Sequence, residues 1–349
     1  MKYKFQQVSK INLLNKANCR DDMGLKKNKN FIQCIKLFDN KLLINDSRTL
    51  KIYNFPFFNL ITQYAGCFSV TILKSKNLAC CDNYGKISFY SIKDNKFKLI
   101  QKIDVIKDKT VYRVKELKDN MLVSCQDERA LTFYEYDKNN ELYNIKKKIN
   151  FNDFIDNILY IKDNHLLLYQ NEYYGINNFN YKVIVYDYKN KNTLKEIASE
   201  FGNGLIYEPF KFLNKNTVAA IISKNIVLID INKNYNIITK ISTNSYWLNC
   251  ICIINDNCII TGDDYGSIIL CELKNNQLFE KAKYKFYIKK KDSSLGYSIT
   301  DLLYLGNNLF FVGGIYYDIS SILNIFSSSD SESPHIPYSG YISDVYEVI

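Results

Sequence analysis

The chain contains few of the residues on which catalytic and phosphate-binding sites usually depend. Its 349 residues include 13 Gly, 4 Pro and 2 His. So little glycine argues against a Gly-rich phosphate-binding loop. His165 follows a turn asparagine and begins an apolar segment, which predicts a structural role, and His335 lies in a Ser/Pro-rich segment with nothing rigid to position a general base. We therefore predict that the protein is not an enzyme and holds no cofactor.

Metal-binding and membrane-spanning patterns are also missing from the sequence. None of the ten Cys forms a Cys-x-x-Cys pair, and several, such as Cys80, Cys81 and Cys250, lie in apolar runs typical of buried, reduced thiols. No apolar run reaches the roughly 18 residues of a membrane span, and the N-terminus lacks the apolar stretch of a signal peptide. We therefore expect no metal site and no transmembrane segment, and we predict a cytoplasmic protein.

What the sequence does contain is a repeated cassette. An apolar strand, a short turn closing on Asn and a second, wholly apolar strand recur seven times. The asparagines that close these turns are Asn40, Asn77, Asn120, Asn164, Asn216, Asn257 and Asn308. Asparagine tolerates the positive φ that tight hairpins need. A second hairpin and a more polar fourth strand follow each cassette, as in residues 82–90 and 97–103.

Four short antiparallel strands repeated about every 40–45 residues are typical of a β-propeller. Middle strands covered on both faces by neighbouring blades should be apolar throughout, as observed. We predict an all-β, seven-bladed propeller of four-stranded antiparallel blades, forming a single domain over residues 1–326 with its blades in 31–326. The seventh cassette ends after residues 323–326, one strand short, so residues 1–14 are expected to close the ring. Residues 341–349 are a competing candidate for that outer strand, and we otherwise assign 327–349 to a Ser-rich linker and tail.

At this point the chain resembles the WD40-repeat family. The segment 261–268, Thr-Gly-Asp-Asp-Tyr-Gly-Ser-Ile, is similar to the second hairpin of that family's repeat, and Tyr186-Asp187 and Ile229-Asp230 stand where its Trp-Asp dipeptide would be. The family's Gly-His and Trp-Asp dipeptides do not occur in this sequence. The resemblance implies a non-enzymatic scaffold that binds other proteins as a subunit of a larger intracellular complex.

An aromatic residue precedes each turn asparagine by 8 to 11 positions, near the start of each innermost strand. A rim of tyrosine and tryptophan around the central opening could anchor a partner protein, although rings tucked between blades would give the same pattern. The candidate partner-binding residues, with the neighbouring arginine, are Phe31, Phe68, Tyr112, Arg113, Phe154, Tyr207, Trp247 and Tyr297.

The formal net charge is +10, and lysine supplies most of it because only four arginines occur. Two lysine triplets, Lys146, Lys147 and Lys148 and then Lys289, Lys290 and Lys291, fall at the ends of outer strands. They form a candidate basic patch. The alternative function is therefore binding of an acidic ligand, namely nucleic acid, a phosphoinositide or a phosphopeptide, although solvated strand edges also carry lysine.

Overall fold

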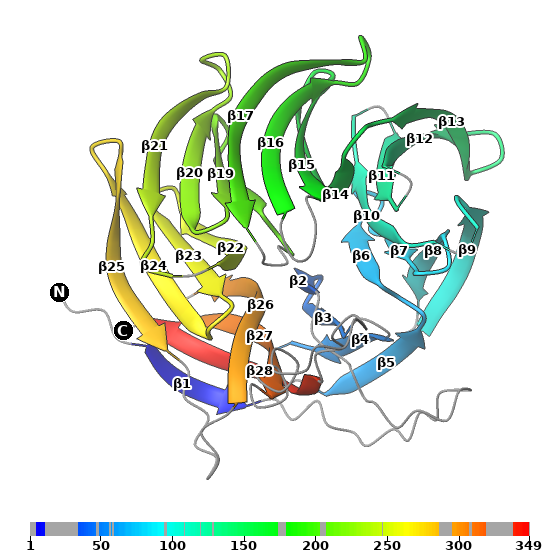
Figure 1. Ribbon diagram of the computed structural model, residues 1–349. Helices are drawn as coiled ribbons and strands as arrows, with labels where there is room; N and C mark the ends of the chain where they lie inside the picture. Colours follow the sequence, from blue (N-terminus) through cyan, green and yellow to red (C-terminus); the bar gives the residue numbers. More distant parts are fainter. Residues whose placement is uncertain are drawn as a thin grey trace, which may run out of the picture.

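The computed structural model shows a closed ring of seven sheets around one axis (Figure 1). It describes residues 5–10, 34–46, 49–55, 57, 59–93, 96–107, 109–118, 120–127, 129–173, 179–202, 207–245, 247–285, 295–306, 309–318 and 338–348. These residues contain no helix, and each sheet has four strands. We number the blades 1 to 7 from the sheet that begins at Cys34. The predicted seven-bladed, all-β propeller is confirmed.

The innermost strands line the axis, and the second strands pair with them. The innermost strands are β2 (Cys34–Phe38), β6 (Ser69–Ile72), β10 (Val111–Glu116), β14 (Phe154–Lys162), β18 (Phe210–Asn214), β22 (Leu248–Asn255) and β26 (Leu295–Gly306). The second strands are β3 (Lys41–Asn45), β7 (Leu78–Cys81), β11 (Met121–Gln126), β15 (His165–Tyr173), β19 (Thr217–Ile222), β23 (Cys258–Asp263) and β27 (Leu309–Asp318).

The third and outermost strands complete the blades in the same order. The third strands are β4 (Thr49–Asn54), β8 (Lys86–Lys93), β12 (Ala130–Asp137), β16 (Phe179–Asp187), β20 (Asn225–Asp230), β24 (Ser267–Lys274) and β28 (Tyr338–Val348). The outermost strands are β5 (Leu60–Ala65), β9 (Lys96–Asp104), β13 (Leu142–Asn150), β17 (Asn192–Gly202), β21 (Asn236–Ser242), β25 (Gln277–Lys285) and β1 (Phe5–Lys10).

The apolar core lies between blades, as the continuous apolar strands predict. Seven clusters of buried side chains each join two neighbouring blades. Ile221 and Leu228 of blade 5, for example, pack with Ile259 of blade 6. Outer strands such as β9 and β13 are mostly exposed. Burial of both faces of the inner strands against their neighbours therefore holds the ring together.

Both ends of the chain enter blade 7, whose strand order is β26-β27-β28-β1. The N-terminal strand is outermost, as predicted. The assignment of 327–349 to a linker and tail is wrong for 338–348, because β28 pairs with β27 on one side and β1 on the other. The expected third strand at 323–326 lies outside the described residues.

The repeated asparagines lie in the turns between first and second strands, but only some adopt the predicted backbone conformation. Asn40 and Asn120 have φ of 56° and 58°, whereas the residue before the asparagine, Lys76 or Asp163, takes the positive φ in blades 2 and 4. A different bond is common to five blades. In each, the asparagine carbonyl accepts a hydrogen bond from a backbone N–H near the end of the third strand. In blade 4, for example, the Tyr188 N–H donates to the Asn164 carbonyl at 3.0 Å.

Candidate functional site

The ring has two faces, which we name from the course of the inner strands. The starting face is where the seven innermost strands begin, and it also carries the turns between second and third strands. The turn face, opposite, carries the asparagine turns. This alternation follows from the antiparallel order of every blade.

Within the described part of the chain, the predicted aromatic residues lie at or just before the starts of innermost strands, on the starting face. Phe68, Tyr112 and Phe154 are half-buried, and the Phe68 and Tyr112 ring centroids are 6.3 Å apart. The Arg129 guanidinium lies over the Phe154 ring, 4.5 Å from its centroid. Trp247 is half-buried directly before β22.

The remaining members of this set are less informative. Tyr207 is half-buried just before β18, and its backbone carbonyl accepts hydrogen bonds from Arg113 and Asn157. The backbone of Tyr297 lies in β26, whereas its side chain and all of Phe31 lie outside the described residues. Whether these rings contact a partner therefore stays a prediction.

A repeated polar pair, which sequence analysis missed, supports three of these strand starts. Each pair joins an innermost-strand residue to the residue fifteen positions later, which lies near the end of the second strand or in the turn that follows it. The pairs are Tyr112 with Asp127, Asp156 with Asn171, and Asn249 with Asp264. The Tyr112 hydroxyl donates to Asp127, and the Asn249 amide donates to Asp264 at 2.6 Å. Because the residue types differ among blades, no identity repeat reveals this spacing.

These pairs hold partly buried carboxyl groups. Burial raises the pKa of Asp156 to about 6, although the hydrogen bond from Asn171 opposes the shift. Burial likewise raises the pKa of Asp264 to about 6, opposed by hydrogen bonds from Asn249 and Ser298. Burial and the neighbouring Asp127 raise the pKa of Tyr112. Two partly buried carboxyl groups with raised pKa, those of Asp156 and Asp264, therefore lie beneath the starting face.

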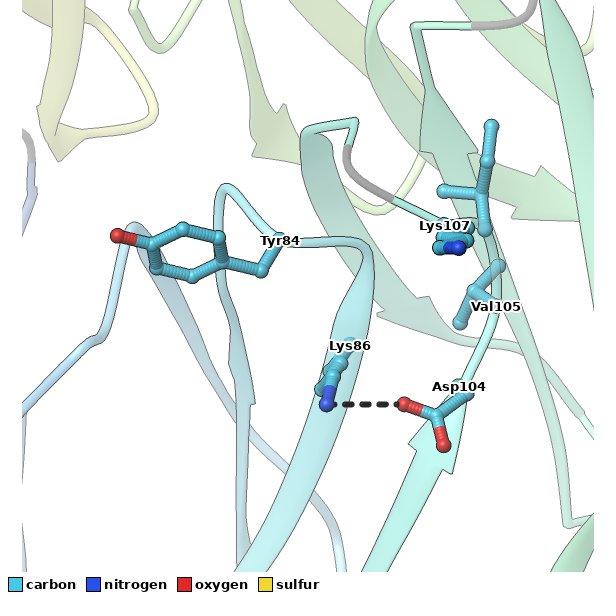
Figure 2. Close-up of a pocket in the computed structure, with 6 residues that line it drawn as sticks. Tyr84, Lys86, Asp104, Val105 and Lys107 are labelled. Carbon is cyan, nitrogen blue, oxygen red and sulfur yellow. Dashed lines mark ion pairs between the residues drawn. The ribbon is translucent and has the colours of Figure 1, made fainter.

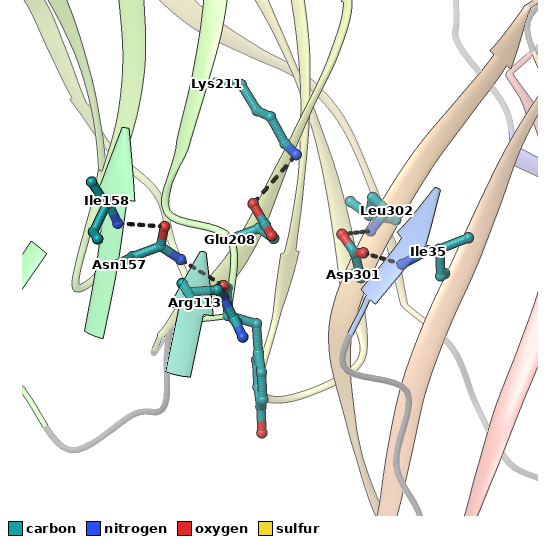
Figure 3. A network of polar contacts seen from close by, with 9 residues as sticks. Ile35, Arg113, Asn157, Ile158, Glu208, Lys211, Asp301 and Leu302 are labelled. Atoms are coloured by element: carbon teal, nitrogen blue, oxygen red, sulfur yellow. Dashed lines mark hydrogen bonds and ion pairs between the residues drawn. The ribbon is translucent and has the colours of Figure 1, made fainter. Parts of the chain in front are cut away.

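The Arg113 side chain bonds within the ring, from blade 3 to the chain entering blade 5, instead of pointing outward to a partner. Its Nη1 donates to the Tyr112 carbonyl and its Nη2 donates to the Tyr207 carbonyl, both at 2.9 Å. Asn157 Nδ2 donates to the same Tyr207 oxygen at 3.0 Å. Arg113 is only 7% exposed. Figure 3 shows Arg113 and Asn157 converging there, with Glu208 and Lys211 beside them.

Two tyrosines at turn tips give the starting face its exposed aromatic surface. Tyr84 and Tyr265 occupy the same place in two Asp-x-Tyr-Gly turns, in blades 2 and 6. They are 63% and 44% exposed. In each turn the first aspartate accepts the tyrosine backbone N–H, at 2.9 Å. The sequence predicts both turns as hairpins, but it does not indicate that their tyrosines are exposed.

A shallow depression lies beside Tyr84 (Figure 2). It is lined by Tyr84, Lys86, Asp104, Val105, Ile106 and Lys107. Lys86 and Asp104 form an ion pair of 3.3 Å across it. Gly85, with φ of 85°, accepts backbone hydrogen bonds from Val105 and Ile106 at 2.8 and 3.1 Å. This close approach of the turn to the 104–107 segment shapes the depression.

The first lysine triplet does not form one surface. Lys146 pairs with Glu135 at 2.7 Å. Lys147 donates to the Tyr188 carbonyl at 2.8 Å and lies over the Phe133 ring, so it packs against blade 4. Lys148 is exposed. Lys289, Lys290 and Lys291 lie outside the described residues.

Within the described part of the chain, no group of three or more His, Cys, Asp or Glu side chains could hold a metal ion. The nine cysteines described are free thiols. His165 hydrogen-bonds the Tyr235 hydroxyl and lies 3.9 Å from Asp187, in contacts that support the hairpin. None of the described segments forms a helix long and apolar enough to span a membrane.

Two carboxylates do lie near the axis, but both are engaged. Glu208 pairs with Lys211, Nζ to Oε2 at 3.5 Å. Asp301 accepts the backbone N–H groups of Ile35 and Leu302, at 2.6 and 2.8 Å, and so connects blade 7 to blade 1. Burial raises the pKa of Asp301 to about 6.

Comparison with known proteins shows the class to which this fold belongs. No family model matches the chain, and no curated protein matches it in sequence. The structure of U3-55K superposes with a TM-score of 0.62 at 8% identity, covering 93% of this chain and 97% of that one. The WD40 repeats of RRP9 give 0.61 at 8% identity, covering 93% and 96%. The chain therefore has the fold of a WD40-repeat β-propeller.

Proposed function

We propose that this chain is a non-enzymatic protein–protein interaction scaffold, a WD40-like subunit of a larger cytoplasmic complex. The observation that carries the proposal is the exposure of Tyr84 and Tyr265 at turn tips on the face where the half-buried aromatics also lie. Tyrosine and tryptophan are enriched among residues that dominate interface energetics. Rigid blades hold these rings in fixed positions, which lowers the entropy cost of binding.

The test compares two faces of the same protein. The full chain, immobilised, captures partners from a cell extract, and crosslinking with mass spectrometry identifies which face they contact. The double variant with Tyr84→Ala and Trp247→Ala should no longer capture these partners. Phe57→Ala is the matched control, because Phe57 is 77% exposed in the β4–β5 connection on the turn face. Partners that depend on Phe57 but not on Tyr84 and Trp247 would contradict the proposal.

Binding of an acidic ligand through the lysine triplets is less well supported, because Lys146 and Lys147 already have partners within the protein. A nucleic acid or membrane ligand would dissociate steeply with added salt. Partner capture that is insensitive to salt would reject that alternative.

A further inference from the structure

Positive side chains from three non-adjacent blades approach one another near the ring axis. Lys36 comes from β2, Lys115 from β10 and Lys211 from β18, and Arg113 lies two residues before Lys115. All four are close enough for their charges to act on the carboxylate of Glu208. We call these four residues the axial basic cluster. Sequence analysis did not identify Lys36, Lys115 or Lys211, because they lie far apart along the chain.

The cluster has more positive charge than its surroundings neutralise. Glu208 pairs with Lys211, and both oxygens of Asp301 accept backbone N–H groups. Among the residues that the structure describes, the side chains of Lys36 and Lys115 form no hydrogen bond and no ion pair. The Nε of Arg113 is buried without a hydrogen-bond partner. An unpartnered buried donor costs roughly 1–3 kcal/mol, and more when it is charged, unless a ligand satisfies it.

The charge on Lys115 is itself disfavoured. Burial lowers the pKa of Lys115 to about 8, and the positive charges of Lys36, Lys211 and Arg113 add to that effect while Glu208 opposes it. A bound anion would oppose the effects of burial and of the neighbouring cations, and would favour the charged form of Lys115.

The positions of the cluster residues along their strands point to access from the turn face. On the starting-face side, the hydrogen bond from Arg113 to the Tyr207 carbonyl joins blades 3 and 5. Arg113 and Lys115 occupy positions i and i+2 of β10 in unbroken register, so they face the same side of the strand, and Lys115 lies nearer the turn face. Lys36 and Lys115 are half-buried, and the Lys211 side chain is 38% exposed.

We propose that the axial basic cluster binds a phosphate group of a small soluble compound, which enters from the turn face. All four cationic side chains act on Glu208, and Lys211 also acts on Asp301. Arg113 also acts on Asp156. A phosphate near neutral pH carries about −1.5 to −2 charges, enough to balance the excess that remains. A position between inner strands suits a small anion better than a flat membrane or a duplex.

Titration calorimetry of the full chain at constant ionic strength tests this site, with inorganic phosphate and tripolyphosphate as separate probes and sulfate for comparison. We expect one saturable site per chain and a rise in Tm on binding. Saturation by inorganic phosphate would indicate a single phosphate group as the ligand, and much tighter binding of tripolyphosphate would indicate a polyphosphorylated compound. Either result supports the site.

Matched substitutions distinguish anion binding at this cluster from nonspecific attraction to the positive charge of the whole protein. Lys115→Met and Lys36→Met should each weaken anion binding at least tenfold, and without anion the Tm should stay equal or rise because repulsion is relieved. Lys98→Met, which removes one exposed lysine from β9, should leave the affinity unchanged. Equal losses in Lys98→Met, no saturable binding, or binding of a phosphoserine peptide without binding of either phosphate probe would overturn the proposal. If Lys115→Met fails to fold, Lys115→Gln replaces it. The site is independent of the aromatic face, so either proposal can fail alone.

Discussion

Arg113 of blade 3 donates a hydrogen bond to the backbone carbonyl of Tyr207, which leads into blade 5, at 2.9 Å. Blade 4 lies between these two blades and contributes Asn157 to the same oxygen, at 3.0 Å. One carbonyl group thus accepts hydrogen bonds from two blades and fixes three blades relative to one another near the axis. The planar guanidinium makes this possible because it directs several donors at once.

Removing that guanidinium should destabilise the protein. We expect Arg113→Met to lower the free energy of unfolding by about 1–3 kcal/mol, because two buried carbonyl contacts are lost. Chemical denaturation monitored by circular dichroism measures this change. Arg129→Met is the control, since Arg129 donates to the Asn152 carbonyl at an exposed position and should cost less than about 1 kcal/mol. Equal losses in the two variants would contradict this account.

Stability should rise with pH in the range where Lys115 loses its proton. Its pKa falls from 10.5 to about 8 in the folded state, mainly through burial. At high pH Lys115 is neutral in the folded protein, and the burial of its side chain carries no charge penalty. As pH falls through 8 the folded protein must take up the disfavoured charge, so this advantage in stability is lost. Relative to Lys115→Met, the wild-type free energy of unfolding should increase between pH 7 and 9, by at most about 1.4 kcal/mol per pH unit.

Measuring the difference between the two proteins removes the contribution of the cysteines. Burial raises the pKa of thiols such as Cys125, to about 12, and their effect on stability near pH 9 is the same in both proteins. Parallel pH profiles for wild type and Lys115→Met would show that Lys115 is not a desolvated cation.

Gly85 should tolerate no side chain. A Cβ there would lie 1.4 Å from the Ile106 carbonyl oxygen, so the 104–107 segment would have to move. Gly66 has a similar φ, 82° against 85°, but a Cβ there would have nothing within 4 Å. Gly66→Ala should therefore cost about 1–2 kcal/mol from backbone conformation alone, and Gly85→Ala more than about 3 kcal/mol. Thermal unfolding of both variants checks this order. Similar losses of stability would mean that the 104–107 segment can move at little cost in free energy.

Removing the closing strand should expose a sheet edge. Without residues 1–10, β28 would lose the partner that pairs with it from Phe5↔Val348 to Lys10↔Asp344. Unpaired strand edges recruit other chains, so we expect oligomers or aggregates in size-exclusion chromatography and a lower Tm. A chain lacking only residues 1–4 is the control and should remain like the wild type. A monomeric, equally stable 1–10 deletion would show that β1 is dispensable for closure.

The blades could be predicted from the sequence because burial of inner strands between neighbouring blades produces a repeating pattern of apolar segments. Strand β7 is apolar throughout and β19 is apolar after its first residue, whereas the polar β9 and β13 mark the outer edge. Blade 7 was predicted only in part, because its third strand, β28, comes from beyond a polar segment that carries no strand pattern. Pairing across such a gap is a long-range contact that local sequence does not encode.

The site was less predictable for a geometric reason. Register shifts interrupt five of the innermost strands, for example between Val111 and Arg113 and between Leu248 and Cys250. A bulge changes which side chains face the axis, so alternation along the strand does not identify them. The aromatic positions at strand starts were recognisable, but the convergence of Lys36, Lys115 and Lys211 depends on the closed ring and could not be read from any one blade.

The interlocked termini of blade 7 have a consequence for how the protein is made. Of the described strands, β1 is synthesised first, yet its pairing partner, β28, is synthesised last. During synthesis, β1 therefore stays unpaired and the ring stays open until β28 has been translated. Such a chain would depend on chaperones during synthesis, and completion of the circle would be the last and slowest event of its folding.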